Sequence, residues 1–237
     1  MDYEPTYRIF SIGDSAITID FGSVIDETVN TKVLALFKRL QQHPFAGMIE
    51  AVPAYSSLSI FYNVVALKKS VSANKIVSEW MKEEADRFIR QYSEIDMPPS
   101  VIMNIPVCYD EEFGIDLPQA SKEKNLSIEE IIRMHCGRRY RVFMLGFLPG
   151  FPYMGEVDEK IAMPRKSQPR PVAAGSVAIA GRQTGIYSLA SPGGWSIVGR
   201  TPLKLFDSGK EQPTLLNAGD TVEFYPISKE EFLKMQL

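Results

Sequence analysis

The sequence contains few cysteines and few histidines. Its 237 residues include only two of each, namely Cys108, Cys136, His43 and His135. Two cysteines are too few for a disulfide framework, so we expect a reducing compartment, the cytoplasm. Two histidines exclude a multi-histidine metal site, and the paired spacing of a Cys/His zinc site is missing. The sequence therefore predicts neither a disulfide scaffold nor a bound metal.

Long apolar runs and an excess of basic residues are also missing. No stretch of about 18 apolar residues is present, so we expect no transmembrane segment. The first ten residues, MDYEPTYRIF, lack the apolar centre of a signal peptide. The formal net charge is −3, whereas proteins that bind nucleic acids usually carry a basic excess. We expect a cytoplasmic protein that binds neither membranes nor nucleic acids.

The motifs of a self-sufficient enzyme are absent or incomplete. Residues 194–201, GWSIVGRT, have the spacing of a phosphate-binding P-loop, but their centre has the sequence of a strand and Pro202 follows at once. A P-loop needs slender residues whose amides wrap the phosphate, followed by a helix. Ser176 lacks the second glycine of a hydrolase nucleophile elbow. We therefore expect the chain alone to be inactive.

The first half of the sequence alternates strand and helix patterns. Gly13-Asp14 is a turn pair, and Asp26 is the expected N-cap of the first helix. The expected strands are 7–12, 16–21, 48–52 and 58–62, and the expected helices are 26–42 and 72–92. Two helices on one sheet predict a compact, sandwich-like α+β domain over residues 1–95.

A linker is expected at residues 93–100, SEIDMPPS, because Pro98-Pro99 cannot continue a helix. The second domain, residues 101–237, has a different character: short apolar runs are separated by Gly and Pro. Ser127 and Glu130 form a capping box for a helix to Cys136. The expected strands are 102–107, 141–145, 172–180, 186–189, 195–198 and 221–225. This pattern predicts a barrel or a sandwich.

Charge and aromatic residues concentrate in the second domain. Between Arg133 and Arg200 the chain has ten basic residues, eight of them Arg, and three acidic ones, a local charge of +7. This predicts either a solvated basic face or an anion site, because Arg presents a planar fork that fits carboxylate or phosphate. The loop from Phe147 to Tyr153 either walls a pocket, presents a docking surface or plugs the barrel. His135 is either a packed core residue or a catalytic one.

Five strings together resemble one family. They are IGDSAITIDFG (12–22), VPAYSSLSIFY (52–62), EFGIDL (112–117), GFLPGFPYMG (146–155) and AAGSVAIAGRQTGIYSLASPGGWSIVGRTPLKLFD (173–207), with the Pro-Arg pairs between the last two. The resemblance is to the Kip inhibitor family, also called allophanate hydrolase subunit 1 or the B-type 5-oxoprolinase subunit. It covers nearly the whole chain. The chain departs from the family pattern at Asp110-Glu111, where the family usually has two glycines, and at Ile115 and Ser188, where proline is common.

The resemblance implies a cyclophilin-like β-barrel in the second domain and a role in a larger assembly. The implied partners are a C-type sister subunit of related fold and an A-type subunit, which together with this chain cleave pyroglutamate (5-oxoproline) to L-glutamate with ATP. A second role in the family is inhibition of a sporulation-type sensor histidine kinase, and a related pair of modules forms the carboxyl-transferring part of urea carboxylase. A prolyl isomerase activity would follow only from the barrel fold, and fold alone does not carry function.

These considerations give three sets of candidate site residues. Neutralisation of charge in phosphoryl transfer is assigned to arginines as catalytic residues; these are Arg165, Arg170 and Arg200. Substrate binding is assigned to the polar turn; its residues are Arg182, Gln183, Thr184 and Tyr187. Partner binding is assigned to aromatic side chains; these are Phe147, Phe151, Tyr153 and Trp195. We expect ATP to act through the complex, and no metal to bind this chain.

Overall fold

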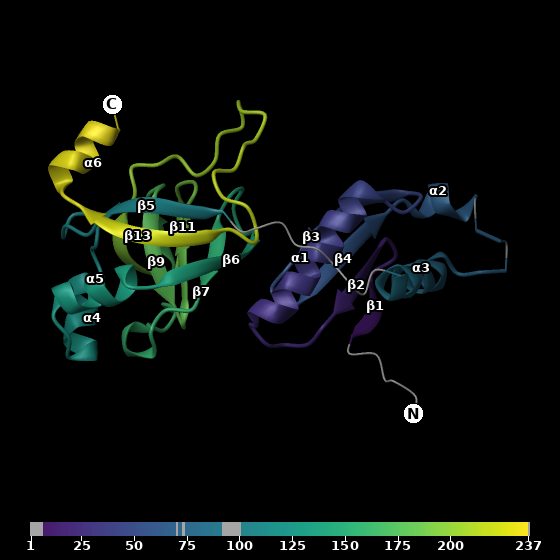
Figure 1. Cartoon of the computed structure of the whole chain (residues 1–237), viewed down its shortest axis with the longest axis horizontal. Helices are drawn as coiled ribbons and strands as arrows, with labels where there is room; N and C mark the ends of the chain where they lie inside the picture. The colour runs from purple at the N-terminus through teal and green to yellow at the C-terminus, as the bar shows by residue number, and fades with distance from the viewer. Residues whose placement is uncertain (1–6, 70, 73, 92–100, 237) are drawn as a thin grey trace. The chain divides into compact units, whose positions relative to one another are not determined.

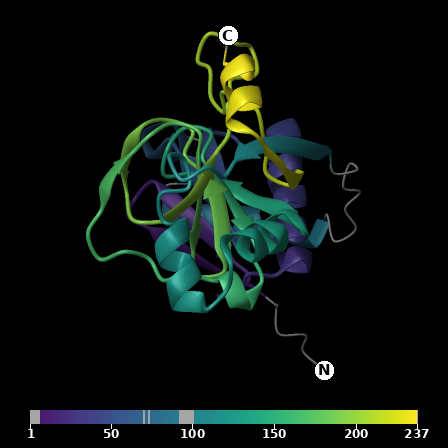
Figure 2. The same cartoon turned by 90° about the vertical axis from the view of Figure 1, so that its left-hand side faces the viewer.

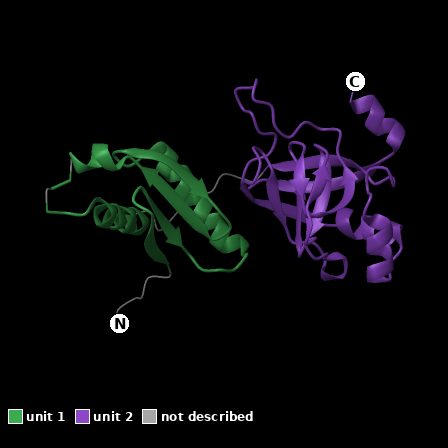
Figure 3. Cartoon of the chain, turned by 180° about the vertical axis from the view of Figure 1, so that it is seen from behind, with its two compact units in different colours: residues 1–99 green, residues 100–237 purple. Residues whose placement is uncertain are grey.

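The structure is a computed structural model that describes residues 7–69, 71–72, 74–91 and 101–236. Two compact units divide the chain, Met1–Pro99 and Ser100–Leu237, as Figure 3 shows by colour. The chain is α+β, as the sequence predicts, with a helix-covered sheet in the first unit and a closed barrel in the second. The predicted linker, residues 93–100, lies outside the described residues.

The first unit is a four-stranded antiparallel sheet with helices packed on one face (Figure 1). Its strand order is β1-β2-β4-β3. The strands are β1 (Arg8–Ile12), β2 (Ala16–Asp20), β3 (Met48–Pro53) and β4 (Ser57–Tyr62), and the helices are α1 (Glu27–Gln42), α2 (Val64–Lys68) and α3 (Val77–Gln91). The apolar faces of α1 and α3 share one core with β2 and β4.

Local signals explain most of these boundaries. The Asp26 side chain accepts from the backbone N–H of Val29 at 2.9 Å and so caps α1 as expected. Gly13, with a φ of +59°, makes the β1–β2 turn. Two helical features differ from the sequence prediction. Helix α3 begins at Val77 rather than at residue 72, and α2 was not expected. Asn63 caps α2 through the N–H of Ala66, a short-range signal that is easily passed over.

The second unit is a closed seven-stranded barrel in the order β10-β7-β6-β13-β5-β12-β9. Only β5 and β13 run parallel among the paired strands of this barrel. The barrel strands are β5 (Ile102–Cys108), β6 (Arg139–Leu145), β7 (Pro152–Gly155), β9 (Ser176–Ala180), β10 (Gln183–Ile186), β12 (Ser196–Arg200) and β13 (Thr221–Ile227). A separate hairpin pairs β8 (Arg170–Val172) with β11 (Ser191–Gly193).

Helices accompany the barrel, and α4 and α5 lie in front of the strands in Figure 2. They are α4 (Leu117–Lys124), α5 (Ile128–Cys136), the 3₁₀ helix η1 (Glu159–Ile161) and α6 (Lys229–Met235). The predicted capping box of Ser127 and Glu130 is present at the start of α5. Ser228 and Glu231 form the same box at the start of α6, a readable signal that the sequence prediction missed. Helix α4 was not expected either.

Two strand predictions in the barrel were wrong. The expected strand 172–180 is divided into β8 and β9 by a turn at Gly175, whose φ is +81°. A Cβ at Gly175 would lie 2.5 Å from the carbonyl oxygen of Thr201, so only glycine fits there. The expected strand 186–189 is displaced, because β10 spans Gln183–Ile186 and ends where that strand should begin. Strands β7 and β11 were missed, since Pro and Gly fill their short sequences.

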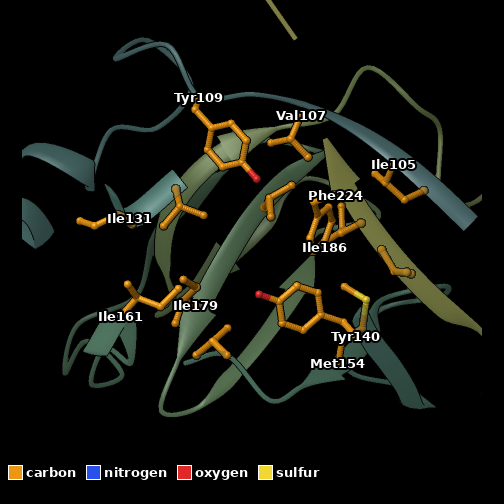
Figure 4. Packing of buried hydrophobic residues seen from close by; sticks show 14 of the residues in the cluster. Ile105, Val107, Tyr109, Ile131, Tyr140, Met154, Ile161, Ile179, Ile186 and Phe224 are labelled. Carbon is orange, nitrogen blue, oxygen red and sulfur yellow. The ribbon is translucent and has the colours of Figure 1, made fainter. Parts of the chain in front are cut away.

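The barrel interior is filled by branched aliphatic and aromatic side chains. Figure 4 shows Tyr109 and Tyr140 among aliphatic residues such as Ile105, Ile179 and Ile186. Strand β9 is buried on both faces: Val177 and Ile179 belong to this interior core, whereas Ala178 and Ala180 belong to a second cluster. Because side chains alternate along a strand, the second cluster covers the outer face of β9. In the described part of the chain, no helix is long and apolar enough to cross a membrane.

Candidate functional site

The cluster on the outer face of β9 is aromatic. Phe151, Tyr187 and Trp195 meet edge to face, with ring centroids 5.2 Å apart for Phe151–Tyr187 and 5.5 Å apart for Phe151–Trp195. Such perpendicular contacts are the favoured geometry of aromatic pairs. The small side chains of Ala178 and Ala180 leave space above the strand for these large rings. The result is a rigid aromatic floor outside the barrel.

A pocket of about 560 Å³ opens above this floor. The volume is that of a small-molecule site. Aromatic rings, prolines and glycines dominate its lining, with one charged side chain, Arg165. The lining residues are Phe147, Phe151, Tyr153, Pro164, Arg165, Pro169, Ala180, Gly181, Gln183, Tyr187, Pro192, Gly193, Gly194 and Trp195. We call this the aromatic pocket.

Close backbone approaches shape the pocket. A Cβ at Gly185 would lie 2.9 Å from the ring of Phe151, and a Cβ at Gly193 would lie 2.2 Å from the hydroxyl oxygen of Tyr187. Both positions therefore require glycine, because larger residues would displace the rings. The Tyr187 ring also packs edge to face on Phe151, which holds it at the base of the pocket. The aromatic pocket is thus preformed by packing and not by loop closure.

Arg165 brings positive charge to the pocket. Its side chain is exposed, and its Cγ and Nε lie along Gly194, at 3.5 and 3.3 Å from where a Cβ would stand. Within the described residues, no carboxylate pairs with Arg165. Burial raises the pKa of the Tyr153 and Tyr187 hydroxyls, and the nearby Arg165 partly offsets both shifts. Arg165 is therefore close enough to act on charge inside the pocket, and its guanidinium is available to an anion.

The buried carboxylate of Asp116 holds the segment that carries Arg165. Asp116 is 8% exposed and accepts hydrogen bonds from Lys166 Nζ at 2.6 Å, from the Ile197 backbone N–H at 2.7 Å and from Arg170 Nη2. A backbone bond from Lys166 N–H to the Gly194 carbonyl, at 2.7 Å, adds a further tie. The sequence prediction gave Asp116 no role. Arg165 thus lies on a segment that Lys166 and Arg170 hold in place.

Only one of the predicted arginines lines the aromatic pocket. Arg170 pairs with Asp116, and Arg182 pairs with Glu156 at 2.7 Å. The Nε of Arg200 donates to the Ala174 carbonyl at 2.8 Å. These three arginines thus bond to other groups of the protein, and of the arginines in the predicted catalytic and substrate-binding sets Arg165 is the one that lines the aromatic pocket.

Strand alternation corrects the predicted substrate-binding set. Gln183 and Tyr187 line the pocket, whereas Thr184 is fully buried and faces the barrel interior. Its Oγ1 donates to the Ala178 carbonyl at 3.1 Å and lies 3.0 Å from His135 Nε2. Neighbouring residues of a strand point to opposite faces, so Gln183 and Thr184 cannot both reach one ligand. A correct placement of β10 would have shown this from the sequence.

The predicted partner-binding aromatics also separate into two groups. Phe151 is 1% exposed and Trp195 is 7% exposed, so both belong to the floor of the pocket and offer almost no surface to another protein. For these two residues the interpretation as interface anchors is wrong, because their rings pack on Ala178 and Ala180. Tyr153 is half-buried in the pocket wall. Phe147 is exposed and stands at the pocket mouth.

His135 belongs to a buried hydrogen-bond chain inside the barrel. Thr184 uses its only proton on the Ala178 carbonyl, so its oxygen must accept from His135 Nε2–H. His135 Nδ1 then accepts from the Tyr109 hydroxyl at 2.8 Å. The ring stacks on Phe224 at 4.7 Å, and burial lowers the pKa of His135 to about 3. His135 is therefore a neutral, fully bonded core residue.

This burial predicts a pH dependence of stability. In the unfolded chain His135 takes up a proton below its ordinary pKa of about 6.5, whereas the folded chain leaves it neutral down to about pH 3. The unfolded state therefore binds more protons in this window. For this group, the free energy of unfolding decreases by about 1.4 kcal/mol for each unit by which the pH is lowered. Urea unfolding of the wild type and His135→Gln between pH 7 and 4.5 should give a steeper decline for the wild type. Parallel curves would contradict the assignment.

Two features of the described residues bear on the chemistry of the pocket. Among the described residues, no group of three or more His, Cys, Asp and Glu side chains could hold a metal ion. Residues 196–200 form strand β12, so the segment with P-loop spacing has no helix to receive a phosphate. The polar side-chain groups of the residues that line the aromatic pocket are one guanidinium, one amide, two phenolic hydroxyls and one indole N–H.

Comparison with known proteins identifies the family of this chain. A family model described as carboxyltransferase domain, subdomain C and D, matches residues 7–216. The chain belongs to this family. Among family relatives, the chain is 44% identical over 228 residues to the B-type 5-oxoprolinase subunit of Bacillus subtilis, covering 95% of each chain. It is 34% identical to the B-type 5-oxoprolinase subunit of Escherichia coli O157:H7, covering 92% of this chain and 95% of the relative.

Two solved structures are similar to this chain. The crystal structure of TTHA0988 superposes with a TM-score of 0.75 at 36% identity, over 90% of this chain. The chain spans only 40% of TTHA0988. The conserved uncharacterized protein PH0987 from Pyrococcus horikoshii is 41% identical, with a TM-score of 0.54, and the match covers 95% of this chain and all of that one. The same domain therefore occurs both as a short chain and within a longer one.

Two departures from the family pattern can be located in the structure. Ser188, where proline is common in the resembling family, is 4% exposed, and its hydroxyl has no hydrogen-bond partner. An unpaired buried hydroxyl costs free energy that a proline would not. The Asp110-Glu111 departure lies in a tight turn, in which the N–H of Gly114 donates to the Asp110 carbonyl at 2.7 Å. This turn is not part of the aromatic pocket's lining.

Proposed function

We propose that this chain is a subunit of an ATP-dependent complex that cleaves 5-oxoproline to L-glutamate, and that the aromatic pocket is its substrate site. The observation that carries the site assignment is Arg165, the one charged side chain in the pocket lining, which pairs with no carboxylate of the described residues. The relatives named as 5-oxoprolinase subunits, which match 95% of this chain in one case, support the choice of reaction.

The pocket suits the chemistry of a small cyclic amide acid. The carboxylate of 5-oxoproline would pair with Arg165, because a guanidinium fork matches a carboxylate in two parallel hydrogen bonds. The ring would lie against Tyr153, Tyr187 and Trp195. The Gln183 side chain has both a donor and an acceptor, as the lactam carbonyl and N–H require. These interactions orient the ring and hold its amide bond away from bulk water.

The remaining chemistry is assigned to other subunits. ATP would phosphorylate the lactam oxygen and leave as ADP. Water would then add to the activated carbon, the C–N bond would break to free the amine, and hydrolysis would release the phosphate with glutamate. The protein's part in such a transfer is mainly positioning and neutralisation of charge. The chain lacks a P-loop, so a C-type sister subunit of related fold and an A-type subunit are the proposed sources of the nucleotide site. In TTHA0988, the matched region is 40% of one longer chain, which supports a domain that works beside others.

Reconstitution tests this proposal. The purified chain alone should release no glutamate from 5-oxoproline and ATP, and the mixture with both sister subunits should release it. Urea serves as the control substrate, because urea amidolyase of Lachancea kluyveri is 26% identical over 95% of this chain. A full rate from the chain alone, or cleavage of urea but not of 5-oxoproline by the complete mixture, would contradict the proposal.

A further inference from the structure

Phe147 has a backbone conformation that a bulky residue seldom adopts. Its φ is +65°, and the N–H of Leu148 donates to the Gly146 carbonyl at 2.7 Å. A hydrogen bond that spans one residue with a positive φ defines the rare and strained kind of γ-turn. Across the described residues, the only other non-glycine with positive φ is Asn125, at the end of α4, where asparagine is well tolerated.

The surrounding loop maintains this conformation. The N–H of Gly146 donates to the Phe151 carbonyl at 3.1 Å, and the N–H of Phe151 donates to the Leu148 carbonyl at 3.0 Å. Gly150, with a φ of +74°, packs against the carbonyl of Leu205. The turn is thus closed on both sides of Phe147. Strain that is held by such a network is typical of functional positions.

The Phe147 ring contributes little to the stability of the fold, because most of it is exposed to solvent. The side chain of Phe147 is 59% exposed. Its ring stands perpendicular to Phe151 and Tyr187, with centroids 5.6 and 6.3 Å away, and it lines the mouth of the aromatic pocket. Glycine would adopt the same turn without strain. We therefore expect Phe147 to be present, despite its strained backbone, because its ring covers the aromatic pocket.

We propose that Phe147 is a specificity-determining residue whose ring covers a small cyclic carboxylate bound in the aromatic pocket, with the carboxylate on Arg165. This inference rests on the proposed function for the identity of the ring, 5-oxoproline. A lactam ring presents two weakly polar faces to the surrounding rings. The product glutamate carries an additional ammonium and a second carboxylate, and the aromatic walls cannot replace the water around these charges. Phe147 therefore favours the cyclic substrate over the open product.

Three variants of the full chain test this role. Phe147→Gly and Phe147→Asn remove the ring but tolerate a positive φ, and Phe147→Tyr keeps a ring of similar shape. The melting temperature of the Gly variant should equal or exceed that of the wild type, because the strain is relieved. In the reconstituted complex, the Gly and Asn variants should raise the KM for 5-oxoproline about tenfold, with kcat within about twofold and with stronger inhibition by glutamate; this is the effect of lost binding. The Tyr variant should restore the KM.

The outcomes separate this inference from the proposed function. An unchanged KM in Phe147→Gly, in a complex that cleaves 5-oxoproline, overturns the inference alone. A lower melting temperature of the Gly variant, or loss of its co-purification with the sister subunits, also overturns it, because the ring would then act in folding or at an interface. A wild-type complex that does not cleave 5-oxoproline overturns the proposed function. In that case, binding of benzoate, a flat ring carboxylate, to the full chain tests the inference. The Kd for benzoate must be about tenfold higher in the Gly and Asn variants than in the wild type.

Discussion

Replacing Asp116 by Ala is expected to destabilise the barrel unit by about 3 kcal/mol. The change leaves Lys166 Nζ, Arg170 Nη2 and the Ile197 N–H without their shared acceptor. Removal of one partner from a buried charge network costs about 3–5 kcal/mol, because the remaining charges stay poorly solvated. The lysine and arginine side chains are about one-third exposed and regain some water, which places this site at the lower limit. Urea unfolding at neutral pH measures the loss.

Two matched variants make this prediction specific. Asp116→Asn keeps the shape and one acceptor oxygen, so it should lose clearly less than the alanine variant. Glu123→Gln changes a carboxylate that lines a small pocket together with Asp116. Within the described residues, Glu123 accepts one exposed hydrogen bond, from Gln119 on the same helix, α4. That control should stay within about 0.5 kcal/mol of the wild type. Equal stability of all three variants would show that Asp116 does not anchor the segment.

The Arg165→Leu variant should lose activity without losing stability. Arg165 has no ion pair among the described residues, and its side chain is exposed, so its removal leaves no buried group unsatisfied. A charge-assisted bidentate pair with a carboxylate is worth about 3 kcal/mol, which corresponds to a loss of about 100-fold in kcat/KM. Arg165→Lys should also be impaired, because an ammonium cannot reproduce the planar fork. Glutamate release by the reconstituted complex and the melting temperature of the chain are the two measurements.

Arg170→Leu provides the matched control for Arg165→Leu. Both arginines lie beside a proline in one short segment, and from the sequence alone the two variants should behave alike. The structure predicts opposite results, because Arg170 binds the buried carboxylate of Asp116 whereas Arg165 faces the pocket. Arg170→Leu should lower the melting temperature by several degrees. If the two variants had the same stability and the same activity, the different roles assigned to Arg165 and Arg170 would be wrong.

Local signals in the sequence are sufficient for the helices with strong caps and for the α+β class. Asp26 and the Ser127–Glu130 box both act as predicted, because a cap depends only on residues three or four apart. The composition of the aromatic loop (Phe147–Tyr153) leaves a pocket wall, a docking surface and a barrel plug open, and residues of this loop line the aromatic pocket. Such features are local, so a single chain reveals them without tertiary information.

Long-range pairing cannot be predicted in the same way. Few acids lie near Arg170 in the sequence, but its partner, Asp116, is 54 residues away. Arg139 likewise pairs with Glu223, 84 residues away, at 2.5 Å. The local charge of +7 therefore overstates the free positive charge. A shift of three residues in the start of β10 also matters, since it leaves Thr184 in a predicted turn when the residue lies on the inner face of a strand.

The location of the substrate is the central claim, and a structure of the reconstituted complex with L-5-oxoproline tests it most directly. We predict the ligand in the aromatic pocket, with its carboxylate within hydrogen-bonding distance of the Arg165 guanidinium, its ring between Trp195 and Phe147, and its amide at Gln183. A ligand bound wholly on one of the sister subunits, with the aromatic pocket empty or filled by side chains of that partner, would contradict it.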